Sequence, residues 1–407
     1  MLTRSKYYPW LTVLTGLLIL TTVNGLINSS ISAFDKTLLQ EFNWTRSELK
    51  LRESVTSAVA IFLLFFSGIL IDKIGSKKMI LLGLSFMTIG LFCYTKIQNK
   101  YQMYAVHIIL AMALVSAGTT AAVVLVSSWY KSNRGIVLGI MLMGTSLGGV
   151  IFPRFIRASI DSNGWRETMF SMMILPICLL IWTLIFIKNK PQDIGLKPVS
   201  DDATDAQSSN LLQSGLTYGE ATKSVIFWLI GITGFFTFYS ILSLLSHTFL
   251  LIQDMGYGAD TATTALMFVA GMSITGKFLF SSLANFFNVS PYKIFAFCCV
   301  GMFLGSLGYS FANKQSIWFA IPVMTMCWGG IYTLYNLIIV RSFGLKSAGK
   351  INSTISIMES AGAALGPWLT GYLHDLTGSY KEGFGVVSLL LFVCVIVSFQ
   401  FKKYAIA

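Results

Sequence analysis

The chain has 407 residues, of which 55% are hydrophobic and only 11% are charged. Soluble domains usually carry about 25% charged residues, so this deficit indicates an integral membrane protein. The formal net charge of +12 would suit nucleic-acid binding, but the basic residues lie mostly in short loops between apolar spans, without zinc-ligand spacing or a phosphate loop. We therefore expect the lipid bilayer, and no nucleic acid, as a partner.

Twelve apolar spans follow one another along the chain, each long enough to cross a bilayer as a helix. The first follows Arg4 and Lys6 as in a signal peptide, but no small-residue cleavage pattern comes after it, so we expect an uncleaved membrane helix. The expected spans are 10–32, 54–72, 78–96, 103–128, 136–157, 168–187, 224–251, 259–285, 291–312, 315–340, 351–373 and 383–401.

A polar stretch between the sixth and seventh spans divides the chain. Residues 188–223 are poor in apolar side chains, which predicts a flexible linker. The expected domains are an N-terminal six-helix bundle over 1–187, the linker, and a C-terminal six-helix bundle over 224–407. Lys and Arg are more frequent on the side that holds both termini and the linker, so the positive-inside rule places these in the cytoplasm.

The short termini and loops are typical of a bacterial inner-membrane protein, and we expect a multi-pass monomer. Asn43-Trp-Thr45 also fits a glycosylation acceptor on the outer side. The three histidines are far apart and the six cysteines fall in or beside apolar spans, so we expect no metal, no cofactor and no disulfide framework.

The two halves repeat one pattern. A basic stretch leads into a glycine-rich helix at Gly135, which ends at Pro153, and a similar stretch leads from Gly349 to Pro367 with the same spacing of 18 residues. Duplicated halves with a binding site near the membrane midplane are typical of transporters. Small residues let helices approach closely, so the motif fits either helices that slide or plain tight packing.

One lysine, Lys277, lies well inside the eighth span. An ammonium at membrane depth costs several kcal/mol unless it meets water or a partner, so such residues usually face a bundle interior or a cavity. We expect Lys277 to face a substrate path.

The loop between the second and third spans reads Gly68-Ile-Leu-Ile-Asp72-Lys73-Ile-Gly75-Ser-Lys77-Lys78. Asp72 ends a helix, Gly75 permits a tight turn, and the basic cluster holds the loop on the cytoplasmic side. The loop resembles the signature loop of the major facilitator superfamily, although its second-half counterpart near 285–293 has lost the acid and the glycine. The resemblance implies the major facilitator fold and a gating role, which we assign to Gly68, Asp72, Gly75, Lys77, Lys78 and Arg134.

Within that superfamily, three stretches resemble the monocarboxylate transporter and oxalate–formate antiporter branch. They are residues 42–49, residues 129–153 with Gly164-Trp165-Arg166, and the run from Gly366-Pro367 through Asp375 to Tyr380. The branch is similar in placing a cation in helix 8 that attracts the substrate carboxylate, and this role carries over to Lys277. The chain departs from the family in having Lys instead of Arg, and Ser273 where an Asp often lies one turn earlier, which puts proton symport by that acid in doubt.

A different acidic residue is expected to take over the role of the Asp that is missing at Ser273. Glu359 lies in the eleventh span at the same depth as Lys277, so the two can meet across the second bundle. One interpretation is a structural ion pair. Alternatively, a carboxylate substrate takes Lys277 and leaves Glu359 to bind a proton, or a zwitterion uses both charges.

Weaker candidates for substrate binding are polar side chains at membrane depth, each of which also fits plain packing. They are Asn24 and Asn28 in the first helix, Tyr239 in the seventh, and Tyr332, Tyr335 and Asn336 in the tenth.

The sequence favours a secondary active transporter that moves a small organic anion by alternating access, as a proton symporter or an exchanger. The alternative keeps the fold and changes the substrate to a zwitterion such as an amino acid, or to an exported polycarboxylate metabolite or siderophore. We expect no enzyme, because the sequence has no nucleophile elbow, no histidine cluster and no acid pair with metal-ligand spacing.

Overall fold

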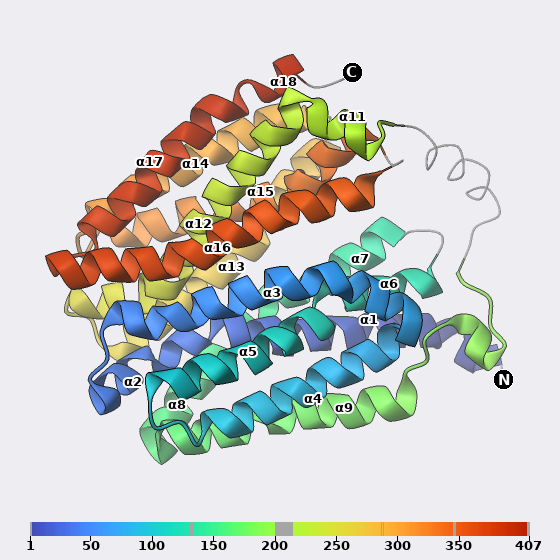
Figure 1. The fold of residues 1–407 in the computed structure, drawn as a ribbon, viewed down its shortest axis with the longest axis horizontal. Coiled ribbons are helices and arrows are strands. Elements are labelled where there is room, and N and C mark those ends of the chain that lie inside the picture. The colour runs from blue at the N-terminus through green and yellow to red at the C-terminus, as the bar shows by residue number, and fades with distance from the viewer. Residues whose placement is uncertain are drawn as a thin grey trace. The chain divides into compact units, whose positions relative to one another are not determined.

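The structure is a computed structural model that describes residues 2–130, 134–199, 215–285, 287, 289–344 and 347–404. These residues form helices, with isolated β-bridges as the only strand-like pairing among them (Figure 1). The predicted linker residues 200–214 and the side chains of Arg134 and Asn336 lie outside the described part.

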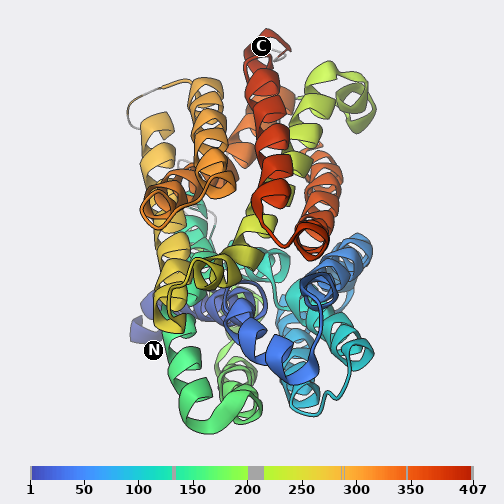
Figure 2. The same cartoon turned by 90° about the vertical axis from the view of Figure 1, so that its left-hand side faces the viewer.

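The chain separates into two compact units. Unit 1 contains Met1–Trp44 and Val55–Asp205, and unit 2 contains Thr45–Ser54 and Ala206–Ala407. The short segment Thr45–Ser54 therefore groups with the C-terminal unit, although the chain on both sides of it belongs to the N-terminal one. Within each unit the long helices run side by side in Figure 1, and Figure 2 shows them closer to end-on.

Unit 1 is built around α1 and α4. α1 packs against α6, α7, α8 and α9, and α4 packs against α5, α6, α8 and α9. The elements are α1 (Leu2–Asn24), the π-helix η1 (Gly25–Ser29), the 3-10 helix η2 (Ile31–Phe34), α2 (Asp35–Phe42), α3 (Arg46–Ile74), α4 (Ser76–Tyr94), α5 (Lys100–Ser116), α6 (Thr119–Trp129), α7 (Arg134–Leu142), α8 (Gly144–Met172), α9 (Ile174–Phe186) and the 3-10 helix η3 (Pro191–Ile194).

Unit 2 is built around α12 and α15. α12 packs against α16, α17 and α13, while α15 packs against α13 and α14. Its elements are α11 (Tyr218–Lys223), α12 (Val225–Asp254), α13 (Ala259–Asn285), α14 (Pro291–Ser310), α15 (Ile317–Phe343), α16 (Ala348–Thr377), α17 (Lys381–Ser398) and α18 (Phe401–Tyr404).

The predicted all-α membrane fold is confirmed, and each predicted span falls on a helix or on consecutive helices. Among the described residues, ten helical stretches are long and apolar enough to cross a membrane. One stretch, Val137–Phe186, covers two predicted spans, because α8 consists of two helical segments that meet in a kink at Gly164, where φ is 79° and ψ is 168°. α16 is long enough to cross a membrane but is not one of these ten stretches, because polar residues such as Glu359 lower its mean hydropathy.

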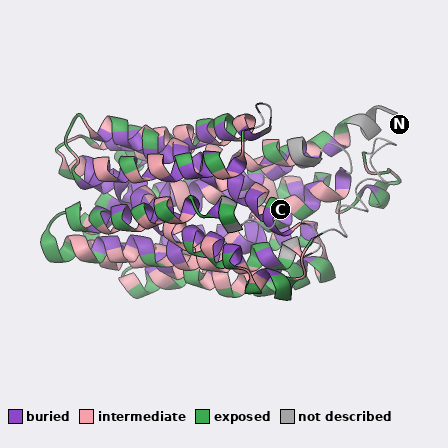
Figure 3. Ribbon diagram, turned by 90° about the horizontal axis from the view of Figure 1, so that it is seen from above, coloured by how far each residue is buried: buried purple, intermediate pink, exposed green. Residues whose placement is uncertain are grey.

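Buried and exposed residues lie on different faces of the long helices (Figure 3). The outward face of α3 exposes large apolar side chains that a water-soluble protein would bury. They are Phe62, Phe65, Phe66, Ile69 and Leu70. In contrast, α12 buries a row of hydroxyl side chains, several of which donate to the carbonyl four residues earlier, as Thr233 does to Leu229 at 2.7 Å. Such internal hydrogen bonds let polar residues exist at membrane depth.

The internal repeat of the sequence is also a repeat of helix packing. A Cβ at Gly148 of α8 would overlap the backbone of Thr21 in α1, and a Cβ at Gly362 of α16 would overlap the backbone of Phe235 in α12. Gly148 and Gly362 are 214 residues apart, as are Thr21 and Phe235. The same glycine contact therefore joins the corresponding helix pair in each unit.

Candidate substrate and gating sites

Lys277 lies on α13 beside an aromatic ring of α15. The side chain is partly buried, and its Nζ atom is 4.8 Å from the centroid of the Tyr332 ring. The face of an aromatic ring carries partial negative charge, so it attracts an ammonium. The two helices come close here because Gly329 of α15 lies against the backbone of Ser273, where any Cβ would overlap. Ser273 is thus part of a backbone contact between the two helices.

Glu359 lies on α16, between α12 and α15. A Cβ on Gly234 of α12 would lie 3.0 Å from the Cγ atom of Glu359 and 3.4 Å from the hydroxyl of Tyr335. Tyr335 is buried and donates a hydrogen bond to the carbonyl of Ile230 at 3.3 Å. Gly234 therefore leaves the space that the Glu359 side chain occupies in the packed interior of unit 2.

Tyr332 links the two predicted charges. Its ring lies beside the Lys277 ammonium, and Tyr335, one turn later on α15, lies beside Glu359 next to Gly234. The predicted candidates Lys277, Tyr332, Tyr335 and Glu359 are therefore brought together within unit 2, and their role in binding substrate stays a prediction.

Tyr239 lies further along α12. It is 3% exposed, and within the described residues its hydroxyl makes no hydrogen bond. Ser243, one turn later, accepts a hydrogen bond from Thr370 of α16 at 3.0 Å. Gly366 of α16 packs against the backbone carbonyl of Tyr239, so this part of the α12–α16 contact is both close and polar.

Asn24 and Asn28 lie in unit 1, where α1 widens into η1. The amide of Asn28 donates to the Oδ1 atom of Asn24 at 3.4 Å, and the amide of Asn24 donates to the carbonyl of Leu20 at 3.3 Å. Single turns of π-helix occur frequently at functional sites, since they reorient side chains and leave backbone groups unpaired. η1 lies against the glycine segment of α8, because Gly25 meets Gly148 and Phe152.

The predicted gating loop joins α3 to α4. Gly75 has a φ of 84°, the left-handed conformation that the predicted tight turn requires. Gly68 has open space around it, and Asp72 and Lys78 are exposed. Lys77 extends to the end of α9, where its Nζ atom donates to the carbonyl of Leu184 at 2.8 Å.

Asn189, which no sequence motif indicated, holds this loop through hydrogen bonds. Its Oδ1 atom accepts from the backbone N–H of Lys77 at 2.8 Å and from the Ser76 hydroxyl at 3.1 Å. Its own carbonyl accepts from Ser128 at 2.8 Å. The predicted gating loop is thus hydrogen-bonded to the first residues of the predicted linker.

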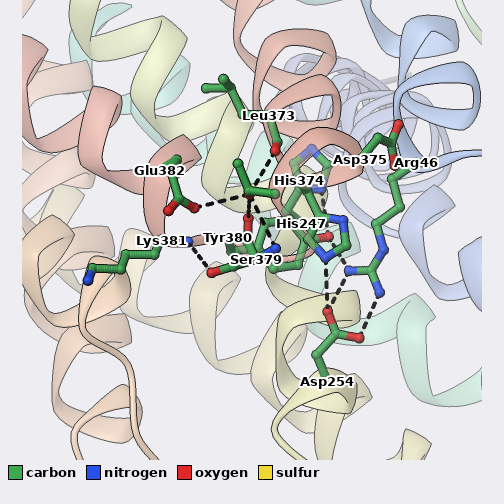
Figure 4. A network of polar contacts seen from close by, with 11 residues as sticks. Arg46, His247, Asp254, Leu373, His374, Asp375, Ser379, Tyr380, Lys381 and Glu382 are labelled. Atoms are coloured by element: carbon green, nitrogen blue, oxygen red, sulfur yellow. Dashed lines mark hydrogen bonds and ion pairs between the residues drawn. The ribbon is translucent and has the colours of Figure 1, made fainter.

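A second polar network lies in unit 2, at the start of α3 (Figure 4). The guanidinium of Arg46 donates two hydrogen bonds to Asp254, of 2.6 and 2.7 Å, and a third to the hydroxyl of Tyr380 at 2.6 Å. The carboxylate of Asp375 accepts from the backbone N–H groups of Arg46 and Ser47 at 3.0 and 2.8 Å. Two of the three stretches with branch resemblance therefore meet here.

The residues just before α3 contact the remaining stretch, within unit 1. Glu41 accepts hydrogen bonds from the indole of Trp165 at 2.5 Å and from the guanidinium of Arg166 at 2.6 Å. Phe42 stacks on Trp44 with ring centroids 4.4 Å apart, and it also contacts the ring of Trp165. No local pattern in the sequence indicated the contacts with Trp165 and Arg166, because each of these joins residues more than a hundred positions apart.

Solved structures share this architecture. A bacterial homologue of the human lysosomal transporter Spinster, in an inward-facing and unoccupied conformation, matches with a TM-score of 0.74 at 14% sequence identity. The match covers 98% of this chain and 98% of that one. At this identity the likeness shows the fold alone.

Curated relatives are transporters. The chain is similar to MFS-type transporter pynF of Aspergillus niger, 28% identical over 46% of this chain, although the match spans only 43% of that protein. It is 24% identical to the riboflavin transporter MCH5 of Saccharomyces cerevisiae, over 85% of this chain and 71% of the relative. It is 22% identical to the probable L-galactonate transporter of Escherichia coli, over 92% and 84% of the two chains.

The family model for the Major Facilitator Superfamily matches residues 17–367, which include the end of α1, every helix from α2 to α15 and most of α16. The match, the helical architecture and the relatives agree with each other and point to transport and not to an enzyme. The chain therefore belongs to the Major Facilitator Superfamily and is an integral, multi-pass membrane transporter.

Proposed function

We propose that this transporter moves a small organic anion, of the monocarboxylate type, by alternating access. The observation that carries the proposal is the position of the Lys277 ammonium, 4.8 Å from the ring centroid of Tyr332 and within the membrane-spanning part of unit 2. A cation at this depth needs a compensating group. A carboxylate is a stronger partner for an ammonium than an aromatic face is, so the site can exchange one for the other.

Glu359 gives the site its coupling group in this proposal. Its carboxylate lies near Tyr335 and Tyr332, on the helix next to α12 and α15. When a substrate carboxylate binds Lys277, the site holds two negative charges, which favours proton uptake by Glu359. Protonation of Glu359 would then accompany anion binding, as proton symport requires.

The similarity to one bacterial relative supports the proposed substrate class. The Escherichia coli relative is named as a probable transporter of L-galactonate, which is a hydroxylated monocarboxylate. We therefore extend the proposal to hydroxy-acids, whose hydroxyl groups can bond to Tyr332, Tyr335 and the polar row of α12.

Uptake into proteoliposomes tests the proposal with L-galactonate, lactate and alanine as probes. Lys277→Gln removes the cation, and we expect it to lower uptake of the transported carboxylate by about 10- to 100-fold, the effect of losing a charged hydrogen bond. Lys277→Arg keeps the charge and should retain more uptake than Lys277→Gln. Lys314→Gln, at an exposed lysine outside the site, is the matched control.

The same assay separates proton coupling from simple anion binding. Glu359→Gln should abolish acceleration of carboxylate uptake by an imposed proton gradient while leaving exchange of carboxylate for carboxylate. Intact carboxylate uptake by Lys277→Gln would refute the anion site. Loss of alanine uptake in both Lys277→Gln and Glu359→Gln would instead favour a zwitterionic substrate, since a zwitterion needs both charges.

A further inference from the structure

A groove lies between α14 and α17, two helices of unit 2 that run side by side (Figure 1). Towards one end the helices are joined by a hydrogen bond, in which the hydroxyl of Ser306 on α14 donates to that of Ser388 on α17 at 2.9 Å. One turn away, the ring centroids of Phe303 and Phe392 are 5.5 Å apart. At the other end, where α14 begins and α17 ends, a groove of about 380 Å³ separates the two helices.

The base of the groove is made of small side chains and its edges of large ones. Ala296 and Ser398 line it and are 5% and 2% exposed, so they lie at the base. The hydroxyl of Ser398 is satisfied, because it donates to the carbonyl of Val395 at 2.7 Å. Phe297 and Phe399 also line the groove but are 63% and 66% exposed, so their rings flank it. The groove is therefore a narrow apolar channel on the outer surface of unit 2.

The groove runs along the axis of α14. Tyr292, Ala296 and Val300 line it at intervals of four residues, so they follow one another on one face of the helix. At a rise of 1.5 Å per residue this row is about 12 Å long. Both α14 and α17 are long and apolar enough to cross a membrane. The groove thus extends in the direction in which the acyl chains of a bilayer lie.

One end of the groove is basic. Lys293 lines the groove and is exposed, and it lies in the first turn of α14, where the helix dipole is also positive. α18 holds the chain after α17 beside this helix, because Phe401 is buried and stacks on Phe295 with ring centroids 5.2 Å apart. The exposed Lys403 on α18 therefore adds positive charge at the same end of α14.

This positive charge is not offset by acids of the surrounding helices. In the sequence, residues 261–358 and 383–407 contain no Asp or Glu, and these residues supply α14, α15 and α18 and most of α13 and α17. The positive-inside rule predicts that this end faces the cytoplasm, where anionic lipids give the membrane surface a negative potential. An anionic phosphate at the surface would compensate Lys293, whereas a helix of a second copy would bury this cation in an apolar contact.

We propose that the groove between α14 and α17 binds one anionic glycerophospholipid. An acyl chain lies along Ala296 and Val300, between the rings of Phe297 and Phe399, and the phosphate lies against Lys293. Unlike the lipids that surround any membrane protein, this lipid is selected by its headgroup and held at one place. Its binding goes beyond the proposed transport function and does not depend on which substrate Lys277 binds.

Native mass spectrometry of the full-length protein in detergent tests this selection. Phosphatidylglycerol and phosphatidylcholine with identical acyl chains are titrated separately, and the dissociation constant of the first bound lipid is measured. We expect phosphatidylglycerol to bind at least about fivefold more tightly, which is the effect of one lysine near an anionic lipid surface. Equal dissociation constants for the two lipids would overturn the proposal.

Variants at the groove identify the residues that hold the lipid. Lys293→Gln should weaken binding of phosphatidylglycerol about fivefold and leave that of phosphatidylcholine unchanged, while Lys293→Arg keeps the charge and should bind as the parent does. Phe297→Ala removes one edge of the groove and should weaken both lipids equally. Lys314→Gln, at an exposed lysine beyond the other end of α14, is the matched control. If Lys293→Gln binds phosphatidylglycerol as tightly as the parent, the proposal is wrong.

Photolabelling locates the lipid in a bilayer. In vesicles of phosphatidylcholine, a trace of phosphatidylglycerol with a photoreactive acyl chain should label residues 292–300 and 396–399. Added unlabelled phosphatidylglycerol should remove this label, whereas the same amount of additional phosphatidylcholine should not. A label that both lipids displace equally, or that lies only on other helices, belongs to bulk lipid and would contradict the site.

A second copy of the chain is the competing occupant. It would appear as a lipid-free dimer in detergent that Phe297→Ala separates into monomers, and this result would overturn the proposal. The proposed transport function fails separately, because lipid binding is measured without substrate. A protein that takes up none of the carboxylates refutes the anion site and leaves the lipid measurements to decide the groove.

Discussion

At the residue scale, Asn189 shows how one amide can fix a loop. It accepts from the backbone N–H of Lys77 and from the hydroxyl of Ser76, and it lies where a Cβ on Gly75 would be. Only glycine fits this position, both because φ is positive and because the amide of Asn189 fills the space. The conformation of the predicted gating loop therefore depends on Gly75 and Asn189 as a pair.

Gly75→Ala should lower the free energy of unfolding by about 1–2 kcal/mol from the left-handed backbone alone, and by more because the methyl group displaces Asn189. Thermal unfolding of the purified protein in detergent measures this as a lower apparent Tm. Gly68→Ala is the control in the same motif: it meets open space in a helix, where alanine is favoured, so the Tm should stay unchanged or rise. Equal loss in both variants would argue against the pairing of Gly75 with Asn189.

At the scale of elements, the glycine contacts explain why the sequence repeats. Gly148 lets α8 approach α1, and Gly362 lets α16 approach α12. Without a hydrophobic driving force inside the membrane, such close backbone contact is a main source of helix association. The contact in unit 1 coincides with the π-turn that carries Asn28, so packing and candidate site are joined there.

Gly148→Ala should overpack the α1–α8 contact at a cost of about 1–3 kcal/mol, because its Cβ would meet backbone atoms that cannot swing away. The expected result is a lower yield of monodisperse protein by size-exclusion chromatography and a lower apparent Tm. Gly139→Ala, in α7, meets open space and should behave as the parent does. A Gly148→Ala protein as stable as the parent would show that the helices can separate without loss.

At the scale of the whole molecule, the prediction concerns which side of the membrane each loop faces. The excess of basic residues predicts that both termini and the linker are cytoplasmic. In right-side-out vesicles that lack the accessible Cys178, an impermeant thiol reagent should label Gln98→Cys, between α4 and α5. It should label Gln192→Cys, in η3, only after permeabilisation; both side chains are exposed. The reverse pattern would show the opposite orientation.

The fold could be predicted from the sequence because length and apolar content identify a membrane helix without knowledge of its neighbours. Gly164 lies in the polar break expected between the spans 136–157 and 168–187, and its non-helical φ of 79° forms the kink between the two helical segments of α8. The charged candidates Lys277 and Glu359 were visible because charge is rare at membrane depth. Their relation through Tyr332 was not visible, because it depends on how α13, α15 and α16 pack.

The Arg46 network was beyond sequence reasoning for a similar reason. Its partners lie 208, 329 and 334 residues away, and nothing in the pattern around Arg46 selects Asp254 over another acid. The stretches that contain Arg46, Asp375 and Tyr380 could be singled out by resemblance to a family. Only the three-dimensional arrangement shows that they bind one another.

These separations also set an order of events during synthesis. When α3 is synthesised, Asp254, Asp375 and Tyr380 have not yet been translated. Until then, the Arg46 side chain and the first N–H groups of α3 can be satisfied only by water or by lipid headgroups. The ion pair can form only once α12 is made, and the backbone cap only once α16 is complete. The start of α3 therefore gains these partners only after most of the chain has been made.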